Sequence, residues 1–135
     1  MKKEIIRSKR IGGTYSTTTV HATRAGGFVF VTGQVANKPG SQPTKEQHKV
    51  VELGSIEEQT VQVLENMKAI LEDAGTSFEH IVKRNTYLCH MTDFDIVYKT
   101  FERYFTSGVA STTILANLVV PSARLEIECI AVVPD

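Results

Sequence analysis

Two glutamates near the end of the chain have the type and spacing that could support chemistry. Glu126 and Glu128 alternate with Leu125, Ile127 and Cys129, and this period of two indicates a strand with one apolar and one polar face. Such carboxylates are often simply solvated. If burial raises its pKa toward neutrality, however, a carboxylate can take a proton from water and return it to a leaving group. Surface exposure and acid–base chemistry are therefore both open interpretations.

Other combinations of reactive residues do not form a recognised site. Cys89 and His90 are neighbours on a predicted strand, so their side chains point to opposite faces. Gly26 and Gly27 precede a strand and do not open a helix, which argues against a nucleotide-binding glycine loop. None of the histidines has the spacing of a zinc site; they are His21, His48, His80 and His90. We therefore predict neither a metal nor a cofactor.

The composition indicates one small, electrically balanced domain. The chain has 135 residues, of which 41% are hydrophobic, enough to fill a single core across residues 1–135. Lys and Arg total 15 and so do Asp and Glu, so neither nucleic acid nor a membrane is expected as a partner. Apolar runs are too short for a signal peptide or a membrane span, so we expect a cytoplasmic protein.

Periodicity and turn residues predict an α+β fold. We expect strands at residues 3–7, 17–22, 28–32, 81–89, 111–118 and 122–133. One helix should run from an N-cap at Ser55 to a stop at Gly75, with Glu58 completing a capping box. A second should start at a cap formed by Met91-Thr92-Asp93 and end at Gly108.

The resulting order, β-β-β-α-β-α-β-β, predicts a mixed sheet of about six strands with two helices on one face. The opposite face would have no cover from its own chain, so an oligomer is expected. The connection over residues 35–54 is long for a compact domain and could be a flap or an ornament. Gly33, at the end of a buried strand, permits the close approach of a ligand or backbone, or is simply a turn glycine.

Four segments of the chain together resemble the RidA/YjgF family in order and spacing. They are GGTYS (12–16), RAGGFVFVTGQ (24–34), NMKAIL (66–71) and LEIECIAV (125–132). The resemblance implies a chorismate-mutase-like subunit, a homotrimer and ligand clefts between subunits. It also implies hydrolysis of reactive enamines and imines to a carbonyl compound and ammonia, without a cofactor.

The resemblance assigns roles unevenly. Tyr15 matches a cleft tyrosine, and Glu126 matches the glutamate that holds the attacking water. Ser111 falls where the family has the arginine that clamps the substrate carboxylate, Thr113 falls at a small thiol, and Tyr98 falls at an asparagine. A hydroxyl cannot replace the bidentate guanidinium–carboxylate pair.

Substrate contacts are expected from the Ser111 and Thr113 hydroxyls, from Tyr98 and from the backbone near Thr32 and Gly33. A displaced cation would be a further contact. Arg124 is one candidate cation, although an ion pair with Glu126 or Glu128 is the competing interpretation. Lys45, Lys49 and Arg24 are weaker candidates.

Two functions follow from this mixture of matches and departures. The first is an enamine or imine deaminase with altered substrate recognition, for which a catabolic intermediate such as an aminomuconate-like compound is one candidate substrate. The second is a non-catalytic trimer that binds a small metabolite or acts as a chaperone-like scaffold. The matched Tyr15 and Glu126 favour the first, and the missing arginine favours the second or a substrate without a carboxylate.

Overall fold

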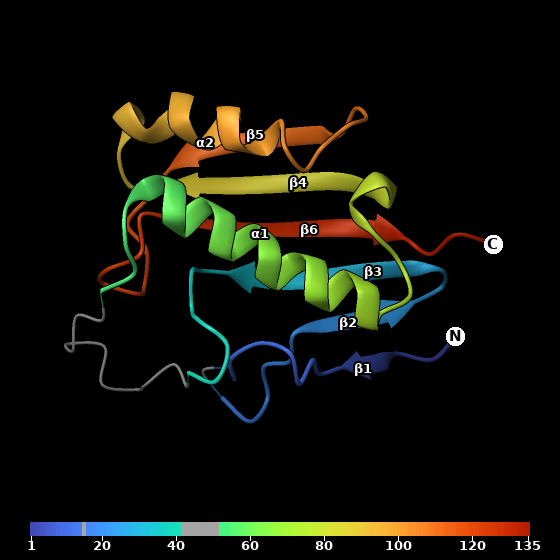
Figure 1. The fold of residues 1–135 in the computed structure, drawn as a ribbon. Helices are drawn as coiled ribbons and strands as arrows, with labels where there is room; N and C mark the ends of the chain where they lie inside the picture. The colour runs from blue at the N-terminus through green and yellow to red at the C-terminus, as the bar shows by residue number, and fades with distance from the viewer. Residues whose placement is uncertain (15, 42–51) are drawn as a thin grey trace.

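The computed structural model describes residues 1–14, 16–41 and 52–135 and shows one six-stranded sheet (Figure 1). Its spatial order is β1-β2-β3-β6-β4-β5. The strands are β1 (Glu4–Ile6), β2 (Ala22–Ala25), β3 (Phe28–Gln34), β4 (Ile81–Leu88), β5 (Ala110–Leu115) and β6 (Leu125–Val132). Among the strands of the described residues, only β4 and β5 pair in parallel, so the sheet is mixed, and the predicted α+β architecture is confirmed.

The predicted strand at residues 17–22 is wrong, because β2 begins only at Ala22. The preceding threonine-rich segment forms a turn in which hydroxyl groups bind backbone. Thr14 Oγ1 donates to the Thr19 carbonyl at 2.7 Å, and the Thr19 N–H donates to Ser16 Oγ at 3.1 Å. Such local bonds compete with strand pairing. Gly26 and Gly27, with φ of 56° and 81°, then make the two-residue hairpin turn between β2 and β3.

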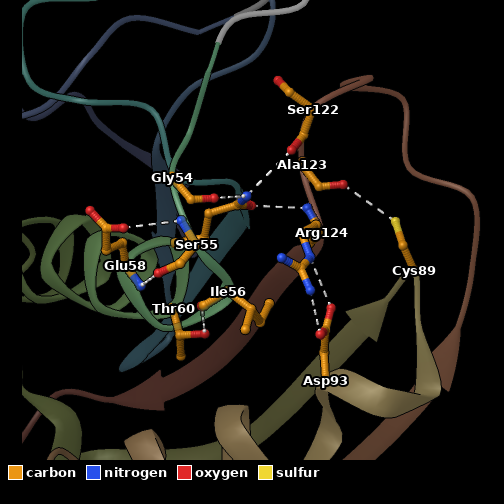
Figure 2. Close-up of polar contacts among 11 residues, drawn as sticks. Gly54, Ser55, Ile56, Glu58, Thr60, Cys89, Asp93, Ser122, Ala123 and Arg124 are labelled. Carbon is orange, nitrogen blue, oxygen red and sulfur yellow. Dashed lines mark hydrogen bonds and ion pairs between the residues drawn. The ribbon is translucent and has the colours of Figure 1, made fainter.

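The long helix α1 (Ile56–Asp73) begins and ends as predicted. Ser55 Oγ accepts from the Glu58 N–H at 3.1 Å, and the Glu58 carboxylate accepts from the Ser55 N–H at 3.2 Å, which completes the capping box (Figure 2). Gly75 ends the helix with φ +87°. Within the described residues, no helix combines the length and the apolar character that crossing a membrane requires.

The second helix, α2 (Phe94–Phe101), is shorter than predicted. Asp93 does not cap it with a side-chain hydrogen bond, because its carboxylate is engaged elsewhere. After Phe101 the chain turns, yet Phe105 still packs edge-on against Phe101, with ring centroids 5.5 Å apart. The predicted aromatic stripe therefore contributes to the core although the helix does not extend to Gly108.

The two faces of the sheet differ in cover. Both helices lie on one face (Figure 1), where Val29, Leu125 and Ile127 are fully buried with α1 residues such as Leu64 and Met67. On the other face the side chains of β3 remain partly exposed, with Phe28 and Phe30 each at 44%. Large apolar side chains left in water favour association with another surface.

His21 fixes the loop that joins β1 to β2. The buried imidazole accepts a hydrogen bond from the Ser8 N–H at Nδ1 (2.8 Å), so its proton lies on Nε2, which is 2.9 Å from the Gly12 carbonyl oxygen. His21→Ala would leave a buried donor and acceptor unpaired. We expect it to lower the free energy of unfolding by about 2–3 kcal/mol, measured by urea unfolding at fixed protein concentration.

His80→Ala is the matched control for this loss. Its imidazole lies beside the exposed Glu79 carboxylate, 3.3 Å away, and such a surface pair contributes little. Equal destabilisation by the two substitutions would show that His21 does not fix the loop.

Candidate functional site

The Glu126 carboxylate lies on the uncovered face of the sheet, against Gly33. The register pairs Glu126 with Tyr87 of β4, and the pairing of β3 with β6 shifts between Val31 and Gln34. A Cβ atom built on Gly33 would lie 2.5 Å from Glu126 Oε2. The glycine therefore makes room for the carboxylate of a neighbouring side chain, whereas we had expected a ligand, a backbone or a simple turn.

Burial is the main cause that raises the pKa of Glu126, and the nearby negative charge of Glu128 raises it further. No group in the described part of the chain donates a hydrogen bond to its carboxylate. A partly buried carboxylate without such donors binds a proton more readily than one in water. The interpretation of Glu126 as an acid–base group thus gains physical support over that of a solvated glutamate.

Gly33→Ala should separate the role of Glu126 from the stability of the fold. The new methyl group would lie only 2.5 Å from Oε2, too close for a normal contact, but the carboxylate is the end of a flexible side chain and can move away. We expect stability to change by less than about 1 kcal/mol, while a misplaced reactive group lowers activity by roughly 100-fold. Urea unfolding and initial rates measure the two effects, and unchanged activity would show that this position of Glu126 is not required.

Tyr15 and Thr32, the other residues predicted near Glu126, are defined to different degrees. Tyr15 lies outside the described residues, so its predicted place in the cleft stays a prediction. Thr32 donates from its backbone N–H to the His21 carbonyl at 3.0 Å and from Oγ1 to the Val20 carbonyl at 2.5 Å. Both of its donors are therefore engaged within the subunit.

Three predicted substrate contacts lie on the helix-covered face, opposite Glu126. The parallel register pairs Ser111 with Arg84 and Thr113 with Thr86, and both Arg84 and Thr86 are buried beneath the helices. The hydroxyls of Tyr98 and Thr113 are hydrogen-bonded to each other. Within one subunit, therefore, the structure does not bring Ser111, Thr113 and Tyr98 to Glu126.

Arg84 is the centre of this second cluster and was not singled out from the sequence. It is 6% exposed, and its guanidinium carbon lies 4.4 Å and 4.5 Å from the ring centroids of Phe101 and Phe105, as in cation–π contacts. Burial alone would raise the pKa of Tyr98, but bonds with Thr113 and Ser111 and the Arg84 charge lower it. The sequence did contain a signal for Arg84. This arginine shares the period-two positions of its strand with residues that are buried.

Arg124 does not pair with Glu126 or Glu128, and the competing ion-pair interpretation is wrong. Its Nε and Nη2 atoms lie 3.1 Å and 2.6 Å from the two oxygens of Asp93 (Figure 2). Arg124 precedes β6, so it is outside the alternation that places the glutamates on one face. The side chain of Gln59 in α1 also holds the backbone of Arg124 in place, because its amide oxygen accepts a hydrogen bond from the Arg124 N–H at 2.9 Å. A guanidinium that makes two hydrogen bonds to Asp93 is not free to bind a substrate carboxylate.

The remaining candidate cations have mixed outcomes. Arg24 donates from Nη1 to the Ala74 carbonyl at 3.3 Å and so helps to end α1. Lys45 and Lys49 lie outside the described residues. Among the residues that are described, no three His, Cys, Asp or Glu side chains gather to hold a metal ion.

Fold and site together define a class: a small α+β subunit that presents a partly buried carboxylate with a raised pKa on the uncovered face of its sheet. The family model described as Endoribonuclease L-PSP matches residues 11–133. The chain therefore belongs to the RidA/YjgF family, which that model represents, and the predicted resemblance is confirmed.

Individual relatives agree with this assignment. A RutC family protein of Pyrococcus abyssi is 35% identical, over 97% of this chain and 98% of its own. The chloroplastic protein named Reactive Intermediate Deaminase A of Arabidopsis thaliana is 35% identical, over 97% and 66%. Among solved structures, the Escherichia coli YjgF gene product superposes with a TM-score of 0.81 at 26% identity, covering 96% of this chain and 98% of that one. Escherichia coli TdcF with bound serine has a TM-score of 0.80 at 25% identity, with 96% and 98% coverage.

Proposed function

We propose that this protein hydrolyses reactive enamines and imines to a carbonyl compound and ammonia, with Glu126 as the acid–base group. The observation that carries the proposal is the Glu126 carboxylate, partly buried against Gly33 and with its pKa raised by burial and by Glu128. The relative named Reactive Intermediate Deaminase A supports the same class of reaction.

The chemistry needs one group that first accepts and then returns protons. An enamine first tautomerises to the imine. Glu126 takes one proton from water as the water oxygen bonds to the imine carbon, and the C=N electron pair moves to nitrogen, which receives that proton. As the carbinolamine collapses, the hydroxyl proton passes through Glu126 to the nitrogen, the C=O bond forms and the C–N bond breaks. Both protons of the water thus leave in ammonia.

We propose further that the uncovered face is closed by other copies of the chain in a homotrimer. Phe28 and Phe30 on β3 and Ile114 on β5 are 44%, 44% and 48% exposed, and the register places all three on the face of Glu126. Covering them would also exclude water around the carboxylate, which strengthens its interactions with a bound substrate.

In this proposal, an arginine does not bind a carboxylate group of the substrate. The two arginines that could have supplied such a contact, Arg24 and Arg124, are engaged with Ala74 and Asp93, and Ser111 lies on the opposite face. We therefore propose that the polar end of the substrate, for which an aminomuconate-like catabolic intermediate is our candidate, is held by groups other than these arginines. TdcF, which was crystallised with bound serine, is a related fold that accommodates a small amino acid.

Two other activities are weaker candidates. A non-catalytic metabolite-binding or chaperone-like trimer would need no acid–base group, so the environment of Glu126 argues against it. Endoribonuclease activity, the term in the family description, would benefit from a basic surface that attracts phosphates, whereas the acidic and basic residues here are equal at 15 each.

The test is ammonia release from imines generated in situ by an amino-acid oxidase or a dehydratase, across amino acids with short, branched and unsaturated side chains. We expect the protein to accelerate release over buffer for at least one substrate class. Light scattering after size exclusion should give three times the 14.9 kDa chain mass. No acceleration for any imine would contradict the proposed reaction, and a monomeric mass would contradict the shared cleft.

A further inference from the structure

The two glutamates of β6 occupy contrasting environments although they share one face of the sheet. Glu128 Oε1 accepts a hydrogen bond from the Tyr87 hydroxyl at 2.6 Å and another from Asn85 Nδ2 at 3.1 Å. Glu126 accepts none from the residues that the structure describes. Two donors therefore fix the Glu128 carboxylate in position, whereas the described residues supply no such donor to the Glu126 carboxylate.

The charges around this pair are few in the described residues. Residues two apart on a strand are separated by about 6.6 Å along its axis, so the charge of Glu128 acts directly on Glu126. Tyr87 faces both carboxylates from β4, and its bond to Glu128 is the main cause that raises the pKa of its own phenol. Lys83, further along β4, donates to Thr112 Oγ1 at 3.3 Å. Beside Glu126, β3 contributes Thr32, Gly33 and Gln34, none of which carries a charge.

We propose that Glu128 is a positioning residue: its charge, fixed by Tyr87 and Asn85, favours proton uptake by Glu126. This role rests on the proposed function, in which Glu126 must both accept and return protons. A pair of carboxylates in contrasting surroundings is a recurring arrangement in acid–base sites. The raised pKa of Glu126, caused by burial first and by Glu128 second, agrees with this assignment.

Glu128→Gln tests the proposal with little structural change. The amide oxygen can still accept from Tyr87 and Asn85, so the variant removes the charge and keeps the acceptor. Carbon-13 NMR of the side-chain carboxyls, in protein labelled at glutamate, follows the titration of Glu126 directly. We expect its midpoint to fall by about 0.5–2 pH units relative to the unsubstituted protein, the range for one charge at this separation in water or near a protein surface.

Glu102→Gln is the matched control, because it removes one exposed carboxylate from the end of α2 and should leave the Glu126 midpoint unchanged. A second measurement needs no substitution at all. Added salt screens charges at this separation, so it should lower the Glu126 midpoint in the unsubstituted protein more than in Glu128→Gln. Equal midpoints in the presence and absence of the Glu128 charge would overturn the proposal.

Kinetics distinguish this inference from the proposed reaction. On the acid side, where activity requires ionised Glu126, the pH–rate profile of Glu128→Gln should shift to lower pH by the amount that NMR reports. A shifted NMR titration in a protein that releases no ammonia would contradict the deaminase function and leave the electrostatic coupling intact. Normal ammonia release with an unshifted titration and profile would retain the function and reject the role of Glu128.

Discussion

Glu126→Gln should lower the rate of ammonia release by about 100- to 10,000-fold, the usual contribution of a general acid–base group. The amide has nearly the same shape as the carboxylate, so it fits against Gly33, but it cannot take a proton from water. The loss should therefore appear in kcat, measured with the imine on which the unsubstituted protein is most active.

Stability provides the control for this substitution. Glutamine carries no charge to desolvate, and burial is the main cause that raises the pKa of Glu126, so the variant should unfold at the same or a slightly higher urea concentration. Glu102→Gln, at an exposed position, should keep full activity. Rates of Glu126→Gln within a few-fold of the unsubstituted protein would remove Glu126 from the chemistry.

Arg124→Ala should cause the largest loss of stability among the substitutions considered. The Asp93 side chain is only 4% exposed and is held by two hydrogen bonds from Arg124, so the variant leaves a buried carboxylate without its partner. We expect the free energy of unfolding to fall by about 2–4 kcal/mol, slightly below the range for fully buried pairs because the Arg124 side chain is 38% exposed. Urea unfolding at constant protein concentration measures the change.

A double-mutant cycle shows whether the ion pair is the cause. Asp93→Asn combined with Arg124→Ala removes both charges and should recover part of the stability lost in Arg124→Ala alone. The folded Arg124→Ala variant should also keep its kcat/KM, since the guanidinium is committed to Asp93. Loss of substrate affinity with little change in stability would instead restore Arg124 as the displaced substrate cation.

Local patterns in the sequence were sufficient for α1 and for β6. The capping box of Ser55 and Glu58 and the left-handed Gly75 depend on contacts within a few residues. The period-two alternation of residues 125–129 likewise fixed the face of Glu126 without knowledge of the neighbouring strands. These features were predictable because the interactions that decide them are close in the chain.

The sequence was a poorer guide to segments in which a side chain forms a hydrogen bond other than the one that the local pattern predicts. Residues 17–20 have strand-forming side chains, but the hydroxyls of Thr14 and Ser16 bind the local backbone and make a turn. Asp93 has the residue type of a helix cap, but its carboxylate is taken by Arg124, 31 residues away. In each case a contact outside the local pattern offered the stronger partner.

The α+β fold and the sheet face that carries Glu126 follow from patterns within single segments of the chain. Which residues surround the Glu126 carboxylate depends instead on how the strands pair with one another. The register of β4, β5 and β6 places Tyr87, Asn85 and Glu128 on the face of Glu126, and Ser111 and Thr113 on the other. A shift of one residue in strand pairing exchanges the two faces, and pairing between strands that are distant in the chain is set by the packing of the whole core.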